Sequence, residues 1–498
     1  MATLRGQHGN SFKSLLTALA VSLGGIIYGI DSGIIATTIS HDSFKYYMYH
    51  SEDAPSGLSA AIVSSYYAGG CIGSLVVGWL MDHLSRRYSL LAGAIVSVIG
   101  AIVQTAAQNA GMMIAGRAVS GISTGILFAV TPVYLSELSP KENRAFLGGL
   151  KGLMTAFGFF LSNWIGYAGS FASGNAQWRI PLAMQLPPAI LLAALTRLLP
   201  FSPRWLVQQE RHDDAKAVLE RLHSNRGHDW VQNELQEIIT QVAQDAELRK
   251  KNEFFALFTP KYFRRTFLAI WVANVSKLSG SVVIQNYQSL MYTALGFSGR
   301  TLLLIAGCYG LMGVLGQILN LVFVSDRWER TKTLYIGSLA LCCILATLAA
   351  LSKFYPDNRN LAGSSAGVAF IFLFSGVFAV FFNSTGWILA SELFPLHLRA
   401  NGVGFAIFTT SITAIWLTQV TPLAFEALAW KFYLIFIAYN LFSAGIYYFL
   451  LPETNQLSLE EIGALFGDEV APDPKAVSGN VKQFPPRNQR KVVHRFIP

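Results

Sequence analysis

Charged residues are scarce in this sequence, and their scarcity excludes most water-soluble folds. Asp, Glu, Lys and Arg make up 13% of the 498 residues, whereas hydrophobic residues make up 52%. A typical soluble domain contains roughly 25% charged residues. Apolar runs of about 20 residues, the length that crosses a bilayer core of about 30 Å, recur along the chain. The composition therefore predicts an integral membrane protein built from spanning helices.

Cysteine is scarce as well, and no pattern of chemically reactive residues takes its place. The four cysteines fall within apolar runs, show no ligand spacing with His, and are interpreted as packing residues: Cys71, Cys308, Cys342 and Cys343. The polar segments contain no nucleophile–base or metal-ligand pattern, so we expect no enzyme activity, no metal and no cofactor. The net charge of +9 is distributed among loops rather than gathered in one patch, which disfavours nucleic-acid binding.

Twelve membrane spans are predicted, with short polar connections between most of them. They cover residues 14–38, 58–81, 89–108, 111–135, 146–168, 180–199, 266–294, 301–324, 333–352, 365–390, 401–424 and 431–451. Lys and Arg concentrate in the loops that are cytoplasmic if both termini lie inside, as the positive-inside rule requires. The first apolar run is too long for a cleavable signal peptide, so it is expected to remain as an anchor. We expect a multi-pass monomer in a lipid bilayer, with the plasma membrane as the simplest location.

Residues 204–265 differ from the surrounding chain because basic and acidic side chains are nearly equal in number there. Stretches such as "HDDAKAVLERLHSNR" have helical periodicity, which predicts a cytoplasmic linker of short amphipathic helices. The predicted domains follow from this division. They are a cytoplasmic tail (1–13), an N-terminal six-helix bundle (14–199), the linker (200–265), a C-terminal six-helix bundle (266–451) and a second cytoplasmic tail (452–498).

The two predicted bundles carry related loop sequences. "SELSPKENRA" at 136–145 returns as "SELFPLHLRA" at 391–400, and "GWLMDHLSRRYSL" at 78–90 has a weaker echo in "FVSDRWERTKTL" at 323–334. Each pair occupies the corresponding loop of its half. A duplicated six-helix unit around a central substrate path is typical of secondary transporters.

Five motifs in order resemble the sugar porter family of the major facilitator superfamily. They are "YGIDSG", "GRAVSGISTG", "PVYLSELSPKENRA", "PFSPRWL" and "PETNQLSLEE". The resemblance runs from Tyr28 to Glu461, and the spacing is similar to that of fungal members. It implies an all-α carrier of twelve helices in two halves, which alternates between outward-open and inward-open states around a central site.

The resemblance assigns the charged loop residues to a cytoplasmic gate made of ion pairs. The matching positions are Asp82, Arg86, Arg87, Glu137, Arg144, Asp326, Arg330, Glu392, Arg399 and Glu453. The alternative is that these residues only set the topology at helix ends. Several positions depart from the family pattern, which predicts a weaker or differently wired gate. Ser85 and Glu329 replace glycines, His83 a basic residue, Thr331 an arginine, and Phe201 an acidic residue.

Asp31 is an isolated carboxylate in an apolar segment, where a charge is costly unless it is paired or protonated. Helix rise places Asp31 roughly 16 Å and Arg117 roughly 12 Å from the outer ends of their spans, so the two can face each other. In proton-coupled members of the family the matching Asp and Arg form the coupling pair. The resemblance thus implies proton coupling through Asp31 and Arg117, and the alternative is a permanent structural ion pair.

The predicted substrate site departs from the sugar pattern. The seventh-helix motif QQLTGIN reads "SKLSGSV" here, with Ser276 and Lys277 in place of the two glutamines, and the fifth-helix glutamine position is Gly152. Substrate contacts are expected from Ser276, Lys277, Gln285, Asn286 and Trp387. For the amides the alternative is a role as hydrogen bonds between helices. Lys277 lies near the midplane and needs a counter-charge, whereas Lys151 is expected to extend to the cytoplasmic surface.

Three functions remain open from the sequence. The first is proton-coupled transport of a sugar or sugar-like polyol by alternating access. The second, which Lys277 and the lost amides favour, is transport of a hydroxylated organic acid or export of a small metabolite. The third is a sugar sensor that does not transport, which the short tail after Leu451 disfavours.

Overall fold

The computed structural model describes residues 12–50, 55–139, 144–249, 255–325, 327–355, 361–394 and 396–455, together with Ile462, Leu465 and Phe466. Every regular element in these residues is helical, and no strand occurs among them. The predicted all-α class is therefore confirmed for the described part of the chain. Residues Met1–Asn455 form one compact unit, and the helices below belong to it.

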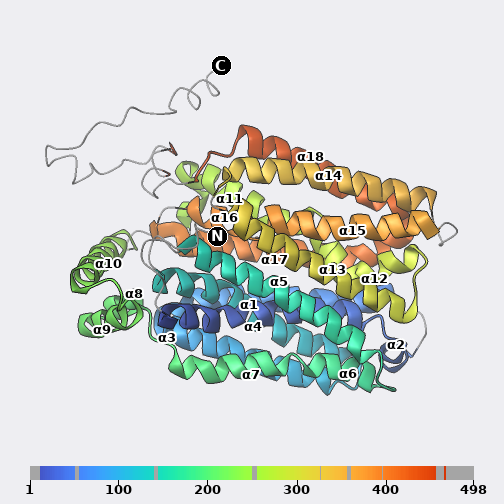
Figure 1. The fold of residues 1–498 in the computed structure, drawn as a ribbon, viewed down its shortest axis with the longest axis horizontal. Helices are drawn as coiled ribbons and strands as arrows, with labels where there is room; N and C mark the ends of the chain where they lie inside the picture. The colour runs from blue at the N-terminus through green and yellow to red at the C-terminus, as the bar shows by residue number, and fades with distance from the viewer. Residues whose placement is uncertain are drawn as a thin grey trace. The chain divides into compact units, whose positions relative to one another are not determined.

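The first half of this unit is a bundle of long apolar helices. Its helices are α1 (Phe12–Thr38), α2 (Asp42–Tyr49), α3 (Ser56–Thr105), α4 (Ala110–Leu138), α5 (Arg144–Gly169), α6 (Ala176–Ala183) and α7 (Leu186–Leu195), followed by a 3₁₀ turn (Thr196–Leu198). Helix α3 packs along α4, and α1 packs along α5 (Figure 1). A buried apolar cluster contributed by α1, α3, α4, α5 and α7 holds this half together.

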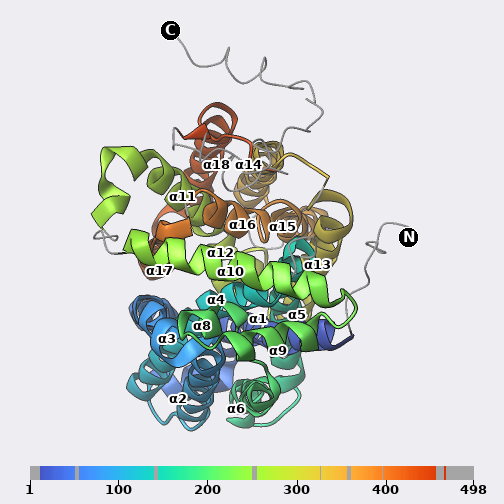
Figure 2. The same cartoon turned by 90° about the vertical axis from the view of Figure 1, so that its left-hand side faces the viewer.

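Three helices between the halves gather at one end of the bundle, on the left of Figure 1. They are α8 (Pro203–Gln208), α9 (His212–Leu222) and α10 (His228–Arg249), and a 3₁₀ turn (Phe255–Phe258) follows them. They share a small apolar core that includes Leu206, Leu219 and Val231. With 22 residues, α10 is longer than the short helices that the sequence predicts. It contacts α8 and α9 and also α17 of the second half (Figure 2).

The second half is also helical, with more interruptions. It comprises α11 (Pro260–Leu278), α12 (Ser281–Ala294), α13 (Gly299–Leu319), a π-helical turn (Asn320–Val324), α14 (Arg330–Phe354), α15 (Leu361–Phe381), α16 (Thr385–Glu392), α17 (Leu396–Leu428), a 3₁₀ turn (Ala429–Phe432) and α18 (Tyr433–Phe449). Helix α14 packs along α18, and α13 packs along α15. The two halves meet where α17 packs on α3, α13 on α5 and α12 on α1.

Nine segments of the described residues are long and apolar enough to cross a membrane. Two of them, Ser56–Thr105 and Asn401–Phe449, contain 50 and 49 residues. At about 1.5 Å per residue each gives roughly 75 Å of helical path, more than twice a bilayer core. Helix α5 is not among the nine. The prediction of twelve spans therefore remains a prediction.

Several predicted single spans are divided into two helices. The predicted span 266–294 breaks between α11 and α12, where Gly280 has a φ of 97°, a conformation open to glycine at little cost. The predicted span 180–199 breaks between α6 and α7, and prolines at the start of α7 lack the N–H that a continuous helix would need. In both places local backbone chemistry overrides the apolar pattern.

Helix α3 contains the reverse case, because it joins two predicted spans through a sharp internal bend at Ser85. Ser85 has φ 75° and ψ 162° and is fully buried. Residues other than glycine rarely adopt this backbone conformation, and it costs on the order of 1–3 kcal/mol. Ser85 is also the position where the family motif has glycine, so the strain comes from the side chain and not from the bend.

We expect Ser85→Gly to stabilise the protein by on the order of 1 kcal/mol. Glycine relieves the strained φ, and the greater conformational entropy of the unfolded chain with glycine offsets part of this stabilisation. Thermal unfolding of the purified protein measures the change. Ser97→Gly is the matched control, since Ser97 is buried in the same helix away from the bend, and it should destabilise the protein. A loss of stability in both variants would mean that Ser85 is not strained.

Candidate functional site

Asp31 of α1 and Arg117 of α4 are neighbours, and both are completely buried. The Arg117 guanidinium donates from Nη1 to the backbone carbonyl of Asp31 over 2.8 Å. Neither carboxylate oxygen of Asp31 has a hydrogen-bond partner among the described residues. The structure thus brings the predicted pair together, but through the backbone of Asp31 and not through its carboxylate.

Two adjacent tyrosines of α3 connect this pair to the second half. Arg117 lies over the ring of Tyr66, 4.3 Å from its centre, and the Tyr66 ring meets the edge of the Tyr67 ring at 5.3 Å. The amide of Asn286 on α12 donates to the Tyr67 hydroxyl over 2.9 Å. Sequence analysis missed both tyrosines. The sequence signal that could have identified them is "YY", two aromatic hydroxyls inside a predicted apolar span.

Lys277 lies near the end of α11 and is 9% exposed. Its ammonium is 5.3 Å from the centre of the Tyr67 ring. Within the described ranges Lys277 forms no ion pair with an acidic side chain. The neighbouring Ser276 hydroxyl donates to the carbonyl of Ala273 in its own helix. Among the described residues, the Tyr67 ring face is therefore the contact that stabilises the cation at the predicted substrate site.

The amides of α12 bind across the interface between the halves. Gln285 donates to the hydroxyl of Ser32 over 3.4 Å, and Gln288 donates to the Asn163 side chain over 2.9 Å. Together with the contact between Asn286 and Tyr67, these bonds join α12 to three helices of the first half. The amides predicted to contact substrate thus form hydrogen bonds between helices. This is the alternative role that the sequence analysis left open for them.

Trp387 of α16 packs on the first half through Phe128 of α4. The two rings meet edge to face with centres 4.9 Å apart, and Tyr28 lies against the same Phe128 ring at 4.8 Å. Lys151 of α5 places its ammonium 3.5 Å from the centre of the Phe128 ring and donates to the Phe128 carbonyl over 3.4 Å. The expectation that Lys151 extends to the membrane surface is therefore wrong, because its side chain turns to the ring and carbonyl of α4.

A set of polar side chains from the second half faces α5, the helix that contains Lys151. Gln317 of α13 donates to the Ser384 hydroxyl over 2.7 Å and accepts from the Asn383 amide over 2.9 Å. A Cβ atom at Gly152 would lie 2.7 Å from the Ser384 hydroxyl oxygen and 3.1 Å from the Gln317 amide nitrogen. A glutamine at position 152, as in the family, would therefore require the Ser384 and Gln317 side chains to move. Gln317 supplies an amide to the same place from the opposite half.

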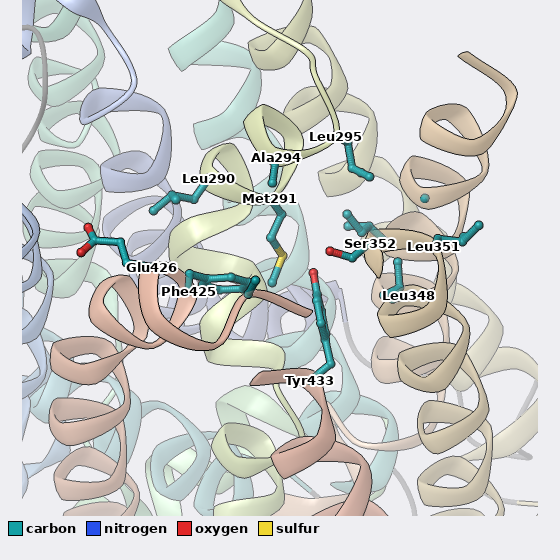
Figure 3. Close-up of a pocket in the computed structure, with 13 residues that line it drawn as sticks. Leu290, Met291, Ala294, Leu295, Leu348, Leu351, Ser352, Phe425, Glu426 and Tyr433 are labelled. Carbon is teal, nitrogen blue, oxygen red and sulfur yellow. The ribbon is translucent and has the colours of Figure 1, made fainter. Parts of the chain in front are cut away.

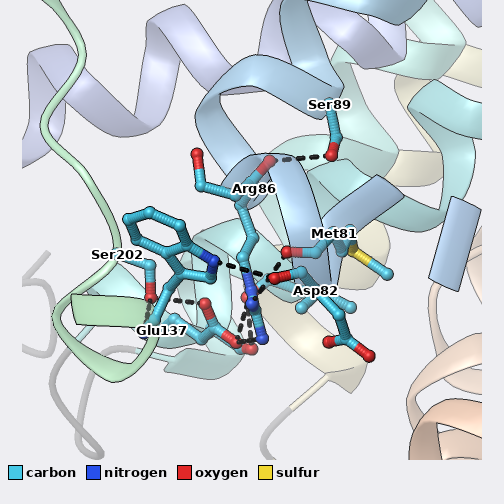
Figure 4. A network of polar contacts seen from close by, with 10 residues as sticks. Met81, Asp82, Arg86, Ser89, Glu137 and Ser202 are labelled. Carbon is cyan, nitrogen blue, oxygen red and sulfur yellow. Dashed lines mark hydrogen bonds and ion pairs between the residues drawn. The ribbon is translucent and has the colours of Figure 1, made fainter. Parts of the chain in front are cut away.

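Three of the predicted gate residues of the first half, Asp82, Arg86 and Glu137, form a compact network at the end that carries α8 to α10 (Figure 4). Arg86 and Glu137 form an ion pair of 2.9 Å, and both side chains are less than 10% exposed. Glu137 also accepts from the Ser202 hydroxyl over 2.5 Å, and Arg86 donates to the Met81 carbonyl over 3.2 Å. Asp82 joins through its backbone carbonyl, which accepts from the Trp205 indole.

Arg87 takes a different set of partners. It donates to the Arg197 carbonyl over 2.9 Å and lies over the ring of Phe201, 5.0 Å from its centre. Phe201 stacks in turn on Trp205. Where the family motif has an acidic residue, this protein places an aromatic ring against the arginine.

The second half repeats the Arg86–Glu137–hydroxyl arrangement. Arg330 and Glu392 form an ion pair of 2.9 Å, and Glu392 accepts from the Thr454 hydroxyl over 3.0 Å. Glu453 caps the start of α14, where its carboxylate accepts from the backbone N–H groups of Arg330 and Thr331. Asp326 lies outside the described residues, as do the side chains of Arg144 and Arg399.

A separate cavity of about 200 Å³ lies within the second half, between α12, α14, α15 and α17 (Figure 3). Its lining is mostly aliphatic and aromatic, including Met291, Leu348 and Phe425, with Tyr433 among the few polar groups. None of the residues predicted to bind substrate lines it. We therefore distinguish this cavity from the candidate site between the halves.

Comparisons with known proteins agree with this architecture. The chain matches the family model for "Sugar (and other) transporter" over residues 17–466. It is 33% identical to the MFS-type transporter criB of Aspergillus cristatus, over 91% of this chain and 93% of that relative. It is 28% identical to the sugar transporter STL1 of Saccharomyces cerevisiae, over 93% and 82% of the two chains. The proton:xylose symporter XylE of E. coli, solved with 6-bromo-6-deoxy-D-glucose, matches with a TM-score of 0.78 and 22% identity, over 92% of this chain and 100% of XylE.

The fold, a two-half helical bundle with charged residues buried between the halves, is that of a solute carrier of the major facilitator type. Since the family model spans most of the sequence, the chain belongs to the sugar transporter family of this superfamily, whose members are membrane transporters and not enzymes. The resemblance inferred from the five motifs is confirmed, and so is the similarity to fungal members.

We expect Arg86→Met to destabilise the protein by about 3 kcal/mol, because it leaves the buried Glu137 carboxylate without its counter-ion. Thermal unfolding of the purified protein measures the loss. Lys45→Met is the matched control, since Lys45 pairs with an Asp42 side chain that is 82% exposed and should change stability by less than about 1 kcal/mol. Equal, small effects of the two substitutions would show that the Arg86 pair contributes no more than a surface contact.

Proposed function

We propose that this protein is a secondary active transporter that moves a sugar or sugar-like polyol together with a proton. The observation that carries the proposal is the state of Asp31, whose buried carboxylate accepts no hydrogen bond from any described residue while Arg117 binds its backbone. A permanent structural ion pair would have carboxylate–guanidinium hydrogen bonds, which stabilise an ion pair away from water. A carboxylate that gains and loses a proton requires no fixed partner.

The coupling follows from the contacts of Arg117. When Asp31 is ionised, its charge attracts the guanidinium that now rests on the Tyr66 ring. When Asp31 is protonated, that attraction ends and Arg117 keeps the carbonyl and the ring as its partners. Tyr66 adjoins Tyr67, and Tyr67 contacts α11 and α12. A change in the protonation of Asp31 therefore affects the packing between the halves. The likeness to the proton:xylose symporter XylE supports this assignment.

Alternating access requires contacts that hold one end of the bundle closed. The ion pairs Arg86–Glu137 and Arg330–Glu392 lie within their own halves and brace the helix ends beside the linker. We assign this end, with α8 to α10, to the cytoplasm, in agreement with the positive-inside distribution of Lys and Arg. The predicted domain boundaries, the cytoplasmic termini and the plasma-membrane location belong to this proposal, as does a monomeric carrier.

The Asp31→Asn variant tests the coupling. It keeps the size of the side chain and removes the titrating group, so uphill accumulation of substrate should be lost while exchange of substrate across the membrane persists. Uptake and exchange of labelled hexoses and polyols by proteoliposomes, with and without an imposed proton gradient, measure both activities. Concentrative uptake at the parent level by the variant would contradict coupling through Asp31.

A hydroxylated organic acid is the second candidate substrate, and Lys277 is the observation that favours it. An ammonium in the interior of a spanning bundle requires a counter-charge, and within the described ranges no acidic side chain pairs with Lys277. A substrate carboxylate would supply that charge. A neutral sugar would instead leave the ammonium on the Tyr67 ring alone.

Lys277→Gln separates the two candidate substrates, because it restores the family's amide and removes the charge. If the substrate is an organic acid, transport of that acid should fall at least tenfold, as expected when a charge-assisted hydrogen bond worth about 1.5–3 kcal/mol is lost. If the substrate is a neutral polyol, transport should be retained or increased. Competition of unlabelled acids and polyols against the transported label measures the preference of the parent and of the variant.

A further inference from the structure

Lys151 is a second interior cation that the proton-coupling scheme does not use. Its ammonium has three N–H donors, yet within the described ranges it makes one hydrogen bond, of 3.4 Å, and forms no ion pair. The Phe128 ring, 3.5 Å from the ammonium, is its other stabilising contact. A ring face offsets only part of the cost of removing an ammonium from water. The site therefore holds a lysine nitrogen with uncommitted donors.

The surroundings of Lys151 come from both halves of the protein. Gly152, the next residue, approaches the hydroxyl of Ser384 so closely that a Cβ atom there would lie 2.7 Å from its oxygen. Ser384 belongs to the hydrogen-bonded set with Gln317 and Asn383, and Trp387 one turn later packs on the Phe128 ring. The side chains at this part of the interface are all partly exposed: Lys151, Phe128 and Trp387 on helices, and Asn383 in the turn between α15 and α16. A lysine, an aromatic wall, and amide and hydroxyl groups thus lie close together at this part of the interface.

The two interior lysines differ in depth. Lys151 lies 7 residues into α5 and Lys277 lies 17 residues into α11, which corresponds to roughly 10 Å and 25 Å from the helix starts beside the linker. Each is held against one aromatic ring, Phe128 or Tyr67, instead of an acid. Measured along these helices, Lys151 thus lies nearer the linker than Lys277 does.

We propose that Lys151, Asn383, Ser384 and Trp387 form an inner binding station for the carboxylate-bearing face of a hydroxylated substrate. The ammonium binds the carboxylate, the amide and hydroxyl groups bind substrate hydroxyls, and the Trp387 ring covers the carbon face. This station deepens the organic-acid candidate above and rests on it, because a neutral sugar needs no charge at Lys151. It assigns two successive positions to the anion, one at each lysine.

Paired probes that differ in charge test the station. Gluconate and sorbitol differ by a carboxylate, and quinate and inositol provide a cyclic pair. Binding to the purified full-length protein is measured by calorimetry for the parent, Lys151→Met, Lys151→Arg and the surface control Lys45→Met. We expect at least one anion to bind the parent at least tenfold more tightly than its neutral counterpart. Lys151→Met should abolish that preference, whereas Lys151→Arg and Lys45→Met should retain it.

The outcomes separate this station from the rest of the proposed function. Unchanged anion preference in a folded Lys151→Met protein, checked by thermal unfolding, would overturn the station. Equal binding of anion and neutral probe by the parent would overturn it as well, and sorbitol or inositol binding would then favour the polyol candidate. Proton coupling is judged separately through Asp31→Asn, which leaves Lys151 intact. A Ser384→Ala variant that weakens both members of a pair equally would assign Ser384 to the substrate hydroxyls.

Discussion

The free-energy cost of an ion away from water determines how this protein arranges its charged side chains. At the end of the bundle beside the linker, arginines meet carboxylates directly, as in Arg86–Glu137 and Arg330–Glu392. Deeper in the bundle, Arg117, Lys151 and Lys277 each rest on a tyrosine or phenylalanine ring. A ring face stabilises a cation without neutralising it. These three side chains thus keep their places in the bundle without a hydrogen bond to a carboxylate among the described residues.

The duplication of the chain is expressed in contacts as well as in sequence. In each half an arginine forms an ion pair with a glutamate. That glutamate also accepts a hydrogen bond from a hydroxyl in the segment after the last helix of the half, Ser202 in the first half and Thr454 in the second. The copies have diverged at the neighbouring position. Glu453 caps the first turn of α14, while Phe201 stacks on Trp205. The conserved element of the repeat is therefore the Arg–Glu–hydroxyl triad, and the residue before each hydroxyl has taken a separate role.

The sequence predicted those parts of the structure that depend on residue spacing. Apolar runs predicted helices, and the family resemblance placed Arg86, Glu137, Arg330 and Glu392 among the gate residues, although it did not say which of them pair. The direction of long side chains was less accessible. Lys151 was expected at the membrane surface because a four-carbon stem can reach it, yet the stem turns to Phe128, whose proximity depends on how α4 and α5 pack. The roles of Tyr66 and Tyr67 were missed for the same reason, since cation–ring contacts between distant helices leave no local pattern in a sequence.

Glu453 caps a helix in the second half, whereas Phe201 stacks on Trp205 in the first half. This difference affects how dissolved salt acts on the two halves. Exposed ion pairs weaken as ionic strength rises, because dissolved ions screen them over about 10 Å at 0.1 M. The contact between Arg87 and the Phe201 ring is partly van der Waals contact and partly attraction to a quadrupole, which decays over a shorter range than the field of a carboxylate. The Arg87–Phe201 contact is therefore less sensitive to salt than an ion pair between Arg87 and a glutamate at position 201 would be.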